Sequence, residues 1–460
     1  MFKLDLTIKK LLEILETTAV GVNGRTMNRK VNLCMDSREP AKGVVFWPIK
    51  GARFDAHQFV PQMEKDGALM SVVNQDAAGI ETFKMYAPVD DTTKALLKLA
   101  KGYQRGFKVK KVAITGSNGK TTTKEMVKTV LSAKYNTHAT AGNFNNHIGV
   151  PMTLFQLKHS HEAAVVEMGT SGPDEIRPLS LATEPDVAVI TNIGASHLER
   201  LGDLDGVFAE KKTITAGLKK GGLLIVNADD PRLCKCRTNT SYKVVTFGIK
   251  RGIYKPEKLT YNEDNCATFY LGRTKFTLNV PGIHNVYNAL AAIAVGEAYK
   301  ISKTEIAKAL ASFRSTNMRM ELKKANGFQI VSDCYNANPS STKMALQTIG
   351  NMKVSRRIAI LGDMLELGKL TDQLHQEMGE MVPEMNFDML FTVGEKAKLY
   401  VKGAKSKGMK KAYHFDSVQA LIDSLTEVVA EGDVLLIKGS RGMHMEQVVD
   451  AMLRLTSVKA

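Results

Sequence analysis

The stretch Gly-Ser-Asn-Gly-Lys-Thr-Thr-Thr at 116–123 has residue types that could bind phosphate. In the usual phosphate-binding loop, four residues separate the first glycine from the Gly-Lys-Ser/Thr sequence. Here Gly116 lies only three residues before Gly119, so the loop is shorter. Its backbone N–H groups and the N-terminus of a following helix can still surround phosphate oxygens. Lys120 would neutralise the β- and γ-phosphates of a nucleotide, and the Thr121 hydroxyl would reach Mg²⁺.

A glycine turn ahead of an ordinary helix is the alternative interpretation of this loop. Glycine, lysine and consecutive threonines at one strand-to-helix junction favour nucleotide binding over that alternative. The residues expected to contact the nucleotide are Gly116, Ser117, Asn118, Gly119, Lys120, Thr121 and Thr122.

Two further apolar runs, at 163–169 and 185–194, end in polar residues, and Glu167 and His197 each lie just past the apolar part of one of them. In a parallel sheet the carboxyl ends of the strands line one crevice, so both side chains can face the loop. A carboxylate suits Mg²⁺, whereas imidazole is an unusual ligand for so hard a cation. Structural roles remain open for both: a hydrogen-bonding histidine, and a glutamate that caps a helix or forms an ion pair.

The surrounding pattern alternates apolar runs with helical segments. The run 110–115 enters the loop, and Met126, Val127, Val130 and Leu131 recur behind it at helical spacing. After about residue 318 the alternation restarts, with apolar runs at 356–364, 387–394 and 432–440. The first 108 residues have shorter strands and many turn residues. We therefore predict an α/β protein of three domains, covering residues 1–108, 109–317 and 318–460.

Composition limits the class of protein and the sign of its ligands. The 460 residues carry a formal net charge of +16, which favours anionic partners without naming them. Five scattered cysteines, an odd number, indicate a reducing compartment. Charges interrupt the first sixteen residues, and no run approaches the ~20 apolar residues of a membrane helix. We expect a cytoplasmic protein without membrane insertion.

Four stretches, in chain order, resemble the Mur ligase superfamily: TGSNGKTTTKE (115–125), VVEMG (165–169), TNIGASHLERLG (191–202) and PGIHNVYNALAA (281–292). That superfamily uses the short G-x-x-G-K-T loop. The resemblance implies an enzyme that makes amide bonds during assembly of peptidoglycan precursors. It also implies a small α/β substrate-binding N-terminal domain, a central P-loop ATPase-like domain with a mostly parallel sheet, and a C-terminal Rossmann-like domain.

Other stretches are similar to the branch of the superfamily that joins D-alanyl-D-alanine to UDP-N-acetylmuramoyl-tripeptide. They are NFNNHIGVPMTL (143–154), DCYNANPSS (333–341), AILGDMLELG (359–368), LHQEMG (374–379) and LIKGSRGMHME (436–446). Before residue 110 the resemblance is weaker, although MDSR, KGARFDAH and VDDTTKAL still fit. The implied reaction uses ATP and Mg²⁺, passes through an acyl phosphate and releases ADP and phosphate.

The resemblance also implies roles for single residues. Catalytic roles fall to Lys120, Glu167, His197, Lys211 and Arg319, and metal ligation falls to Thr121, Glu167, His197 and Lys211. Beyond the loop, ATP would meet Asn285, Asn288, Arg319 and Asp333. The two organic substrates would meet Ser37, Arg38, Asn143, Asn145, Asn146, Asn336, Asn338, Lys438 and Arg441.

Some of these assignments have structural alternatives. The resemblance implies that Lys211 is carbamylated by CO₂, but the adjacent Lys212 fits the motif if its register shifts by one residue. Either lysine could instead be an exposed cation on a helix. Asn285 and Asn288 could instead satisfy the first turn of a helix, and 336–339 could be a structural turn. Asp55 and His57 are better suited to fixing loop shape than to chemistry.

Three other functions would each explain part of the sequence. A superfamily relative could add the third peptide residue or glutamates, but the third domain has YNANP and lacks a DNPR-like segment. A nucleic-acid-dependent ATPase would use the positive charge, but we find no interleaved aromatic residues or groove-binding motif. An inactive nucleotide-binding regulator is disfavoured because Lys120, Glu167 and Arg319 are intact. We expect a monomer without a nucleic-acid partner; lysine or diaminopimelate at the third peptide position stays open.

Overall fold

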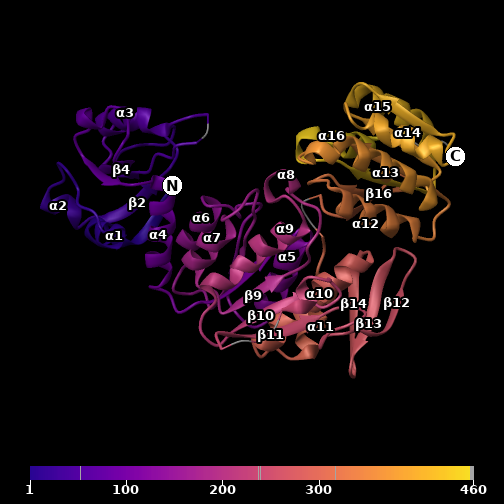
Figure 1. Cartoon of the computed structure of the whole chain (residues 1–460), viewed down its shortest axis with the longest axis horizontal. Helices are drawn as coiled ribbons and strands as arrows, with labels where there is room; N and C mark the ends of the chain where they lie inside the picture. Colours follow the sequence, from indigo (N-terminus) through magenta and orange to yellow (C-terminus); the bar gives the residue numbers. More distant parts are fainter. Residues whose placement is uncertain (52, 237, 239, 316–317, 456–460) are drawn as a thin grey trace.

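The structure is a computed structural model that describes residues 1–51, 53–236, 238, 240–315 and 318–455. The described strands form four sheets, distributed over three lobes that follow one another along the chain (Figure 1). The predicted α/β class with three domains is confirmed. The predicted boundary at residue 108 falls between a helix that ends at Gln104 and a strand that begins at Lys110. The boundary at residue 317 lies outside the described residues.

The first lobe holds a five-stranded sheet in the order β1-β2-β3-β4-β5, in which only the β1–β2 pair is antiparallel. Its strands are β1 Phe2–Thr7, β2 Lys30–Cys34, β3 Val45–Phe46, β4 Met70–Asn74 and β5 Tyr86–Val89. Its helices are α1 Ile8–Leu15, α2 Gly24–Met27, α3 Val60–Lys65 and α4 Thr92–Gln104. Trp47 is fully buried at its centre, and its indole N–H donates to the Thr92 carbonyl at 2.9 Å.

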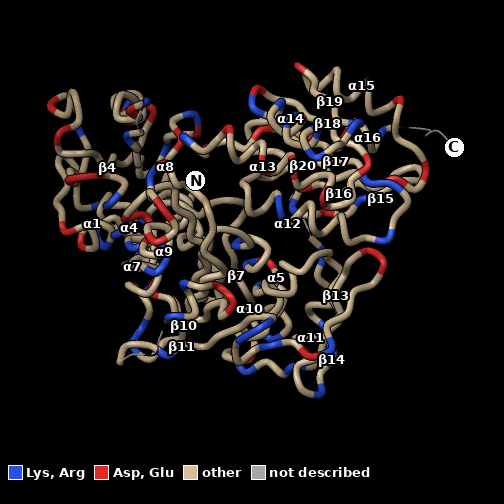
Figure 2. The backbone as a smooth tube through the Cα atoms, turned by 45° about the vertical axis from the view of Figure 1, so that its right-hand side comes forward, with Lys and Arg blue, Asp and Glu red and all other residues tan. Residues whose placement is uncertain are grey.

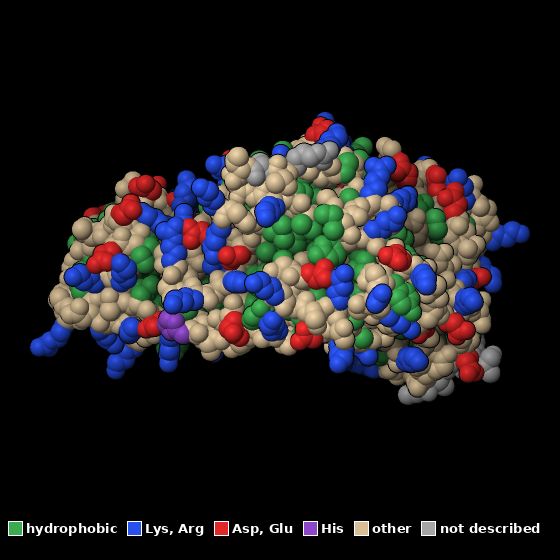
Figure 3. Space-filling model, turned by 90° about the horizontal axis from the view of Figure 1, so that it is seen from below, with side chains coloured by type: hydrophobic (Ala, Val, Ile, Leu, Met, Phe, Trp, Pro, Cys, Tyr) green, Lys and Arg blue, Asp and Glu red, His purple; other side chains and the backbone are tan. Residues whose placement is uncertain are grey.

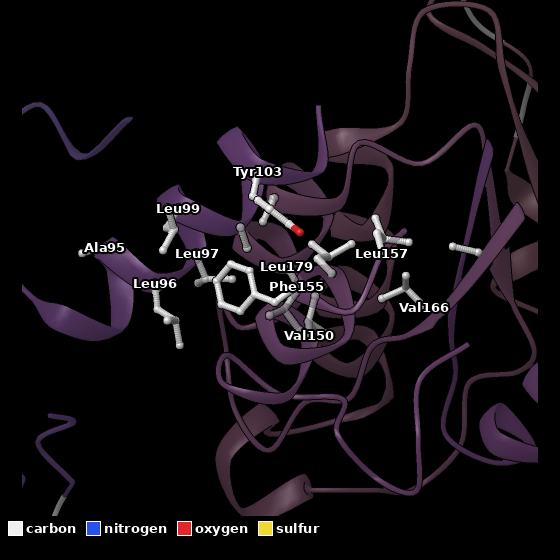
Figure 4. Close-up of a cluster of buried hydrophobic side chains, with 14 of the residues drawn as sticks. Ala95, Leu96, Leu97, Leu99, Tyr103, Val150, Phe155, Leu157, Val166 and Leu179 are labelled. Atoms are coloured by element: carbon white, nitrogen blue, oxygen red, sulfur yellow. The ribbon is translucent and has the colours of Figure 1, made fainter. Parts of the chain in front are cut away.

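Helix α4 joins the first lobe to the second through an apolar contact (Figure 4). The ring of Phe155 lies 5.9 Å from the ring of Tyr103 on α4 and 6.2 Å from the ring of Phe2. Val150 and Leu179 belong to the same buried cluster. Arg105 forms an ion pair with Glu184 at the rim of this contact. The two lobes therefore share one continuous core.

The second lobe is built on a six-stranded parallel sheet in the order β11-β10-β9-β6-β8-β7. Its strands are β6 Lys110–Thr115, β7 Thr137–Ala139, β8 Ala163–Glu167, β9 Val187–Ile190, β10 Gly222–Asn227 and β11 Tyr242–Phe247. Its helices are α5 Lys120–Ser132, α6 Gly149–Phe155, α7 Ile176–Thr183, α8 Leu198–Leu201, α9 Leu204–Lys212, α10 Ile283–Ala298 and α11 Lys303–Ser312. The order reverses around β6, and such a switch point opens a crevice at the carboxyl ends of the strands.

Side chains alternate between the two faces of this sheet, as the period of a strand requires. Val112 and Ile114 pack in one cluster with residues of α5 and α10, such as Val127 and Val286. Ala113 faces the opposite side, in the cluster that contains α6 and α7. Both faces are thus covered, which explains the near-continuous apolar runs in the sequence. An antiparallel sheet, in the order β12-β13-β14, packs beside this lobe: β12 Glu257–Tyr261, β13 Cys266–Leu271 and β14 Thr274–Pro281.

The third lobe has a six-stranded sheet in the order β15-β16-β20-β17-β18-β19, parallel except for β15. Its strands are β15 Glu321–Ala325, β16 Phe328–Asp333, β17 Arg356–Gly362, β18 Met389–Val393, β19 Ala412–Phe415 and β20 Asp433–Lys438. Its helices are α12 Pro339–Gly350, α13 Thr371–Glu384, α14 Lys398–Ser406, α15 Val418–Val428 and α16 Glu446–Arg454. Two buried clusters, one on each face, form its core.

Charged residues of both signs are interspersed along the chain (Figure 2). On the face seen from below, lysine and arginine lie scattered among acidic residues and an apolar area (Figure 3). That face carries no continuous basic stripe of the kind expected for a nucleic-acid groove. Among the described residues, no helix is long and apolar enough to cross a membrane.

Candidate active site

The short glycine loop connects β6 to α5, as predicted. Gly116 has φ +151, and a Cβ atom there would lie 1.8 Å from the Thr191 hydroxyl oxygen, so no side chain fits. Gly119 is left-handed at φ +77 and precedes the first residue of α5. Glycine adopts this conformation without steric cost, which lets the chain turn into the helix.

Residues that follow β9 hold the loop in place. The Asn118 N–H donates to the Asn192 side-chain oxygen at 3.0 Å, and the Asn118 carbonyl accepts from the Thr191 hydroxyl at 2.6 Å. The Ser117 N–H donates to the Asn192 carbonyl at 3.0 Å. The ammonium of Lys120 is folded over the loop and donates to the Gly116 carbonyl at 2.8 Å. Burial lowers the pKa of Lys120, so an anionic ligand would be needed to stabilise its charge.

Glu167 is the last residue of β8 and is 1% exposed. Its Oε1 accepts from the Thr121 hydroxyl at 3.1 Å and from the Asn145 amide at 2.8 Å. Its Oε2 is buried and has no hydrogen-bond partner within the part of the chain that the structure describes. A buried carboxylate oxygen without a partner is costly, and a cation at that position would remove the cost. Thr121 and Glu167 therefore fit one side of a Mg²⁺ site.

No cluster of three or more His, Cys, Asp or Glu side chains that could hold a metal occurs in the described part of the chain. Mg²⁺ is commonly held by one or two carboxylates together with the phosphates of its substrate. Glu167 would supply one such carboxylate, and the glycine loop beside it would position the phosphates.

His197 immediately precedes α8 and has a left-handed backbone at φ 53. Its Nδ1 lies 3.3 Å from the Glu366 carboxylate of the third lobe. Burial, and next the charge of Lys120, lower the pKa of His197. The ring is therefore favoured in its neutral form, which is the form that binds metals.

Burial distinguishes the two adjacent lysines of α9. Lys211 is 1% exposed, and burial together with the nearby Lys120 charge lowers its pKa well below the ordinary value. Lys212 is exposed, and its ammonium lies 5.7 Å from the centroid of the Phe208 ring. Only Lys211 faces the interior, where a neutral amine is favoured.

The third lobe contributes a second group of polar residues. Asp333 and Lys438 are register partners on the neighbouring strands β16 and β20. The Lys438 ammonium donates to Asp333 at 2.6 Å and to the Asn336 carbonyl at 2.9 Å. Lys438 was predicted to meet a substrate carboxylate, and here its charge is engaged by Asp333. Arg441, by contrast, is about half exposed, with its guanidinium 3.5 Å from Glu446.

Arg319 lies between two left-handed residues, Met318 at φ 56 and Met320 at φ 48. Its guanidinium lies 3.9 Å from the centroid of the Tyr335 ring, and its Nε is buried with no hydrogen-bond partner among the described residues. Stacking on Tyr335 holds the guanidinium at the cavity, where its N–H donors can face an anion.

Asn285 and Asn288 lie on one face of α10, and both are buried. The Asn288 amide donates to Asn285 at 3.0 Å, and the Asn285 amide donates to the Pro281 carbonyl at 2.8 Å. Asn288 also accepts from the Thr123 hydroxyl at 3.1 Å. These bonds join the two side chains to each other, to the Pro281 carbonyl and to α5, and none of them caps an N–H group of the first turn of α10 in the described structure. Both side chains line the cavity.

The lobes meet at the glycine loop. Asn338 caps α12 by accepting from the Ser341 N–H at 2.8 Å, and its amide donates to the Asn118 side chain at 3.0 Å. Between the second and third lobes lies a cavity of about 500 Å³. Most predicted residues line it: Ser117, Asn118, Gly119, Lys120, Thr121, Thr122, Asn143, Asn145, Asn146, Glu167, His197, Asn285, Asn288, Arg319, Asp333, Asn336, Asn338, Lys438 and Arg441.

Four predicted residues do not line this cavity. Gly116 lies in the loop itself, and Lys211 lies on α9. Ser37 and Arg38 belong to the first lobe, where Arg38 forms an ion pair with Asp36 at 2.6 Å. Asp55 and His57 do fix a loop: the Asp55 carboxylate lies 2.6 Å from His57 Nδ1, and His57 Nε2 accepts from the Asn74 N–H at 3.0 Å.

Sequence reasoning missed several cavity residues, among them His284, Tyr335 and Glu366. Each of these three lies inside a stretch already quoted for its resemblance, and His284 and Tyr335 also lie beside a residue that was chosen. Glu366 offered the clearest signal, since a carboxylate in the third lobe could face a cationic ligand. Nothing in its spacing, however, indicates contact with His197.

Comparisons with known proteins agree with this geometry. The Mur ligase middle domain matches residues 114–296, and the domain described as "Mur ligase, glutamate ligase domain" matches residues 318–441. The UDP-N-acetylmuramoyl-tripeptide–D-alanyl-D-alanine ligase of Bacillus subtilis is 37% identical over 423 residues, which cover 91% of this chain and 92% of that protein. The chain belongs to the Mur ligase family.

Other members of the family match this Mur ligase over nearly its full length. The ligase of the same name from Escherichia coli is 33% identical and covers 98% of both chains. The crystal structure of MurF from Acinetobacter baumannii has a TM-score of 0.87 at 29% identity, over 98% of this chain and all of that one. MurF from Thermotoga maritima, solved in complex with ADP, has a TM-score of 0.83 at 27% identity, over 92% of this chain and 97% of that one.

Proposed function

We propose that this Mur ligase joins D-alanyl-D-alanine to UDP-N-acetylmuramoyl-tripeptide at the expense of ATP, giving the pentapeptide, ADP and phosphate. The observation that carries the proposal is the cavity itself. The glycine loop and Glu167 form one wall, while Arg319 and Arg441 of the third lobe form the other. The full-length similarity to ligases of that name supports this choice of substrates.

The reaction first brings two anions together, because the terminal carboxylate of the tripeptide attacks the γ-phosphate of ATP. An O–P bond to the carboxylate forms, the P–O bond to the β-phosphate breaks, and ADP leaves. Lys120 and Arg319 supply positive charge to the phosphates, and the loop N–H groups orient them. The amine of the dipeptide then attacks the acyl carbon. A C–N bond forms, the C–O bond to phosphate breaks, and the attacking ammonium loses two protons in total.

Thr121, Glu167 and His197 are the residues proposed to hold Mg²⁺, which would screen the phosphate charge. Lys211 is proposed to be carbamylated, because a buried neutral amine can add CO₂ and become an anionic oxygen donor. The contrast with the exposed Lys212 supports this choice.

The remaining proposals concern the rest of the chain. Ser37 and Arg38 of the first lobe would bind the UDP part of the substrate. Domains at 1–108, 109–317 and 318–460, a monomeric state and a cytoplasmic location complete the proposal. ATP, the diphosphate and the acidic peptide together account for the positive net charge without a nucleic-acid partner.

The test is a reconstitution with ATP, Mg²⁺, UDP-N-acetylmuramoyl-tripeptide and D-alanyl-D-alanine, in which phosphate release and product mass are measured together. Phosphate should appear only with both organic substrates, alongside the pentapeptide mass. Turnover stimulated by another amino acid would reassign the protein within the family. ATP binding without any substrate-dependent turnover would indicate a nucleotide-binding regulator instead. Comparing a lysine-containing tripeptide with a diaminopimelate-containing one would settle the third position.

A further inference from the structure

Among the described residues, the Glu366 side chain differs from the other carboxylates of the cavity in having no hydrogen bond. The carboxylates that line the cavity are Glu167, Glu175, Asp333 and Glu366. Glu167 is held by Thr121 and Asn145, Glu175 accepts from the Ser171 N–H at 2.7 Å, and Asp333 is paired with Lys438. The Glu366 side chain is 69% exposed, and its contact in the described structure is the one with His197.

The loop that carries Glu366 is rigidly held. The Met364 N–H donates to Nε2 of the fully buried His375 at 3.0 Å, and the Leu365 N–H donates to the Ser440 hydroxyl at 2.9 Å. Glu366 itself has a left-handed backbone at φ 63, a conformation that is strained for a residue with a side chain. Such strain in an anchored loop indicates that the direction of this side chain matters.

The neighbours of Glu366 match the remaining parts of a small zwitterionic peptide. The bond from Leu365 to Ser440 places this loop beside Arg441, whose half-exposed guanidinium suits a carboxylate. Leu365, which is 46% exposed, offers an apolar surface for methyl groups. His197, at the other end, belongs to the lobe where the acyl phosphate would form.

Charge explains why a carboxylate is needed here. Lys120, Arg319 and Arg441 make the cavity favourable for phosphates and unfavourable for an incoming ammonium. Among the described residues, Glu366 has an ion pair with His197 and none with a lysine or arginine. An unneutralised carboxylate would offset the repulsion locally and orient the ammonium.

We propose that Glu366 is the specificity residue that receives the ammonium group of the incoming dipeptide and directs its nitrogen towards the acyl phosphate beside His197. This inference rests on the proposed function, since it assumes a zwitterionic dipeptide as the nucleophile. Glu366 contacts the substrate in this assignment, and its role is to bind and orient.

The test compares D-alanyl-D-alanine with N-propionyl-D-alanine, which has the same shape without the amine. Both Kd values are measured by calorimetry on enzyme loaded with a non-hydrolysable ATP analogue and UDP-N-acetylmuramoyl-tripeptide. The native protein should prefer the dipeptide by roughly 10- to 100-fold, the range expected for a hydrogen-bonded charge pair. In Glu366→Gln that ratio should fall to near one, with the Kd of the propionyl compound unchanged.

Glu199→Gln is the matched control, because Glu199 lies beside Gly368 of the same loop and does not line the cavity. This control should keep the native ratio. A Glu366→Gln protein that keeps the native ratio would overturn the inference, as would equal weakening of both ligands, which a latch between the lobes would produce. Ligation by the native protein is measured in the same preparation. If the native protein does not ligate, the proposed function itself is rejected. If it ligates normally but the ratio of the two Kd values is unchanged in Glu366→Gln, only the role of Glu366 is rejected.

Discussion

Lys211 and Lys212 show that the environment of a side chain controls its pKa and its reactivity. They are neighbours on α9 with the same chemistry, yet one is buried near Lys120 and the other is exposed against Phe208. Desolvation disfavours the charged form of the buried amine. A buried amine whose pKa is lowered is neutral more often and is therefore a better nucleophile towards CO₂.

We expect Lys211→Ala to lose most of its ligase activity and to regain part of it when a short carboxylic acid is added, because the acid restores an oxygen donor. Lys212→Ala should remain active without any addition. Activity assays over a range of acid concentrations, together with a carbamate signal from ¹³C-labelled bicarbonate, measure this directly. Rescue of the Lys212 variant alone would shift the assignment by one residue.

Lys120→Ala should abolish ATP turnover and leave the fold intact. In the described part of the chain its ammonium bonds to two carbonyls of its own loop, at Gly116 and Ser117, so few contacts of the core are lost. Circular dichroism and the thermal midpoint check the fold, and phosphate release checks the chemistry. Retained ligation would refute the role of the loop.

His284 should make stability sensitive to acid. Burial lowers its pKa from 6.5 to about 4. As pH falls through that window the unfolded chain takes up a proton that the folded chain does not, so the free energy of unfolding decreases. His284→Gln should therefore show a smaller loss of thermal midpoint between pH 7 and about 4.5. If the thermal midpoint of the variant falls with pH as steeply as that of the native protein, the acid sensitivity arises from other histidines. His197 and His375 are candidates, since their pKa values are also lowered.

At the scale of elements, ends of strands and helices converge on the site. Glu167 ends β8, Asp333 ends β16 and Lys438 ends β20, while α5 and α12 begin at the same cavity. Parallel strands present their carboxyl ends at one edge, and helix N-termini attract anions. Asn338 connects these elements, since it caps α12 and also bonds to the glycine loop.

Two substitutions of Asn338 should separate its two contacts. Asn338→Ala removes the cap and should lower stability by about 1 kcal/mol. Asn338→Asp keeps the capping oxygen and loses the amide that donates to Asn118, so stability should hold while the KM for ATP rises roughly 2- to 10-fold. Thermal midpoints and initial rates for both variants measure this. Equal KM values for the native and aspartate forms would show that the bond to Asn118 does not assist nucleotide binding.

At the scale of the whole molecule, the lobes are joined in different ways. The first and second lobes share a buried apolar cluster through α4, whereas contacts of the third lobe with the second include polar ones, such as Asn118–Asn338 and His197–Glu366. Polar contacts of this kind exchange readily with water. We expect closure around the substrates to move the third lobe more than the first.

Phe155→Ala should therefore destabilise the protein strongly. Its ring packs on Tyr103 and Phe2 across the contact between the first and second lobes, and loss of a buried phenyl group costs about 3–5 kcal/mol. Phe54→Ala is the control, because Phe54 is 57% exposed and should change stability by no more than about 0.5 kcal/mol. Calorimetric unfolding compares the two, and similar midpoints would mean that the contact does not stabilise the lobes.

The sequence alone determined the local features of this protein. Glycines at 116 and 119, Lys120, and the polar residue at the end of each apolar run predicted the nucleotide loop, the strand ends and the parallel sheets, because spacing encodes backbone conformation directly. Only the tertiary structure decided which of Lys211 and Lys212 is buried, that Lys438 pairs with Asp333, and that Glu366 reaches His197. Those facts depend on strand register and on how separate lobes pack, and neither can be predicted from a short stretch of the chain.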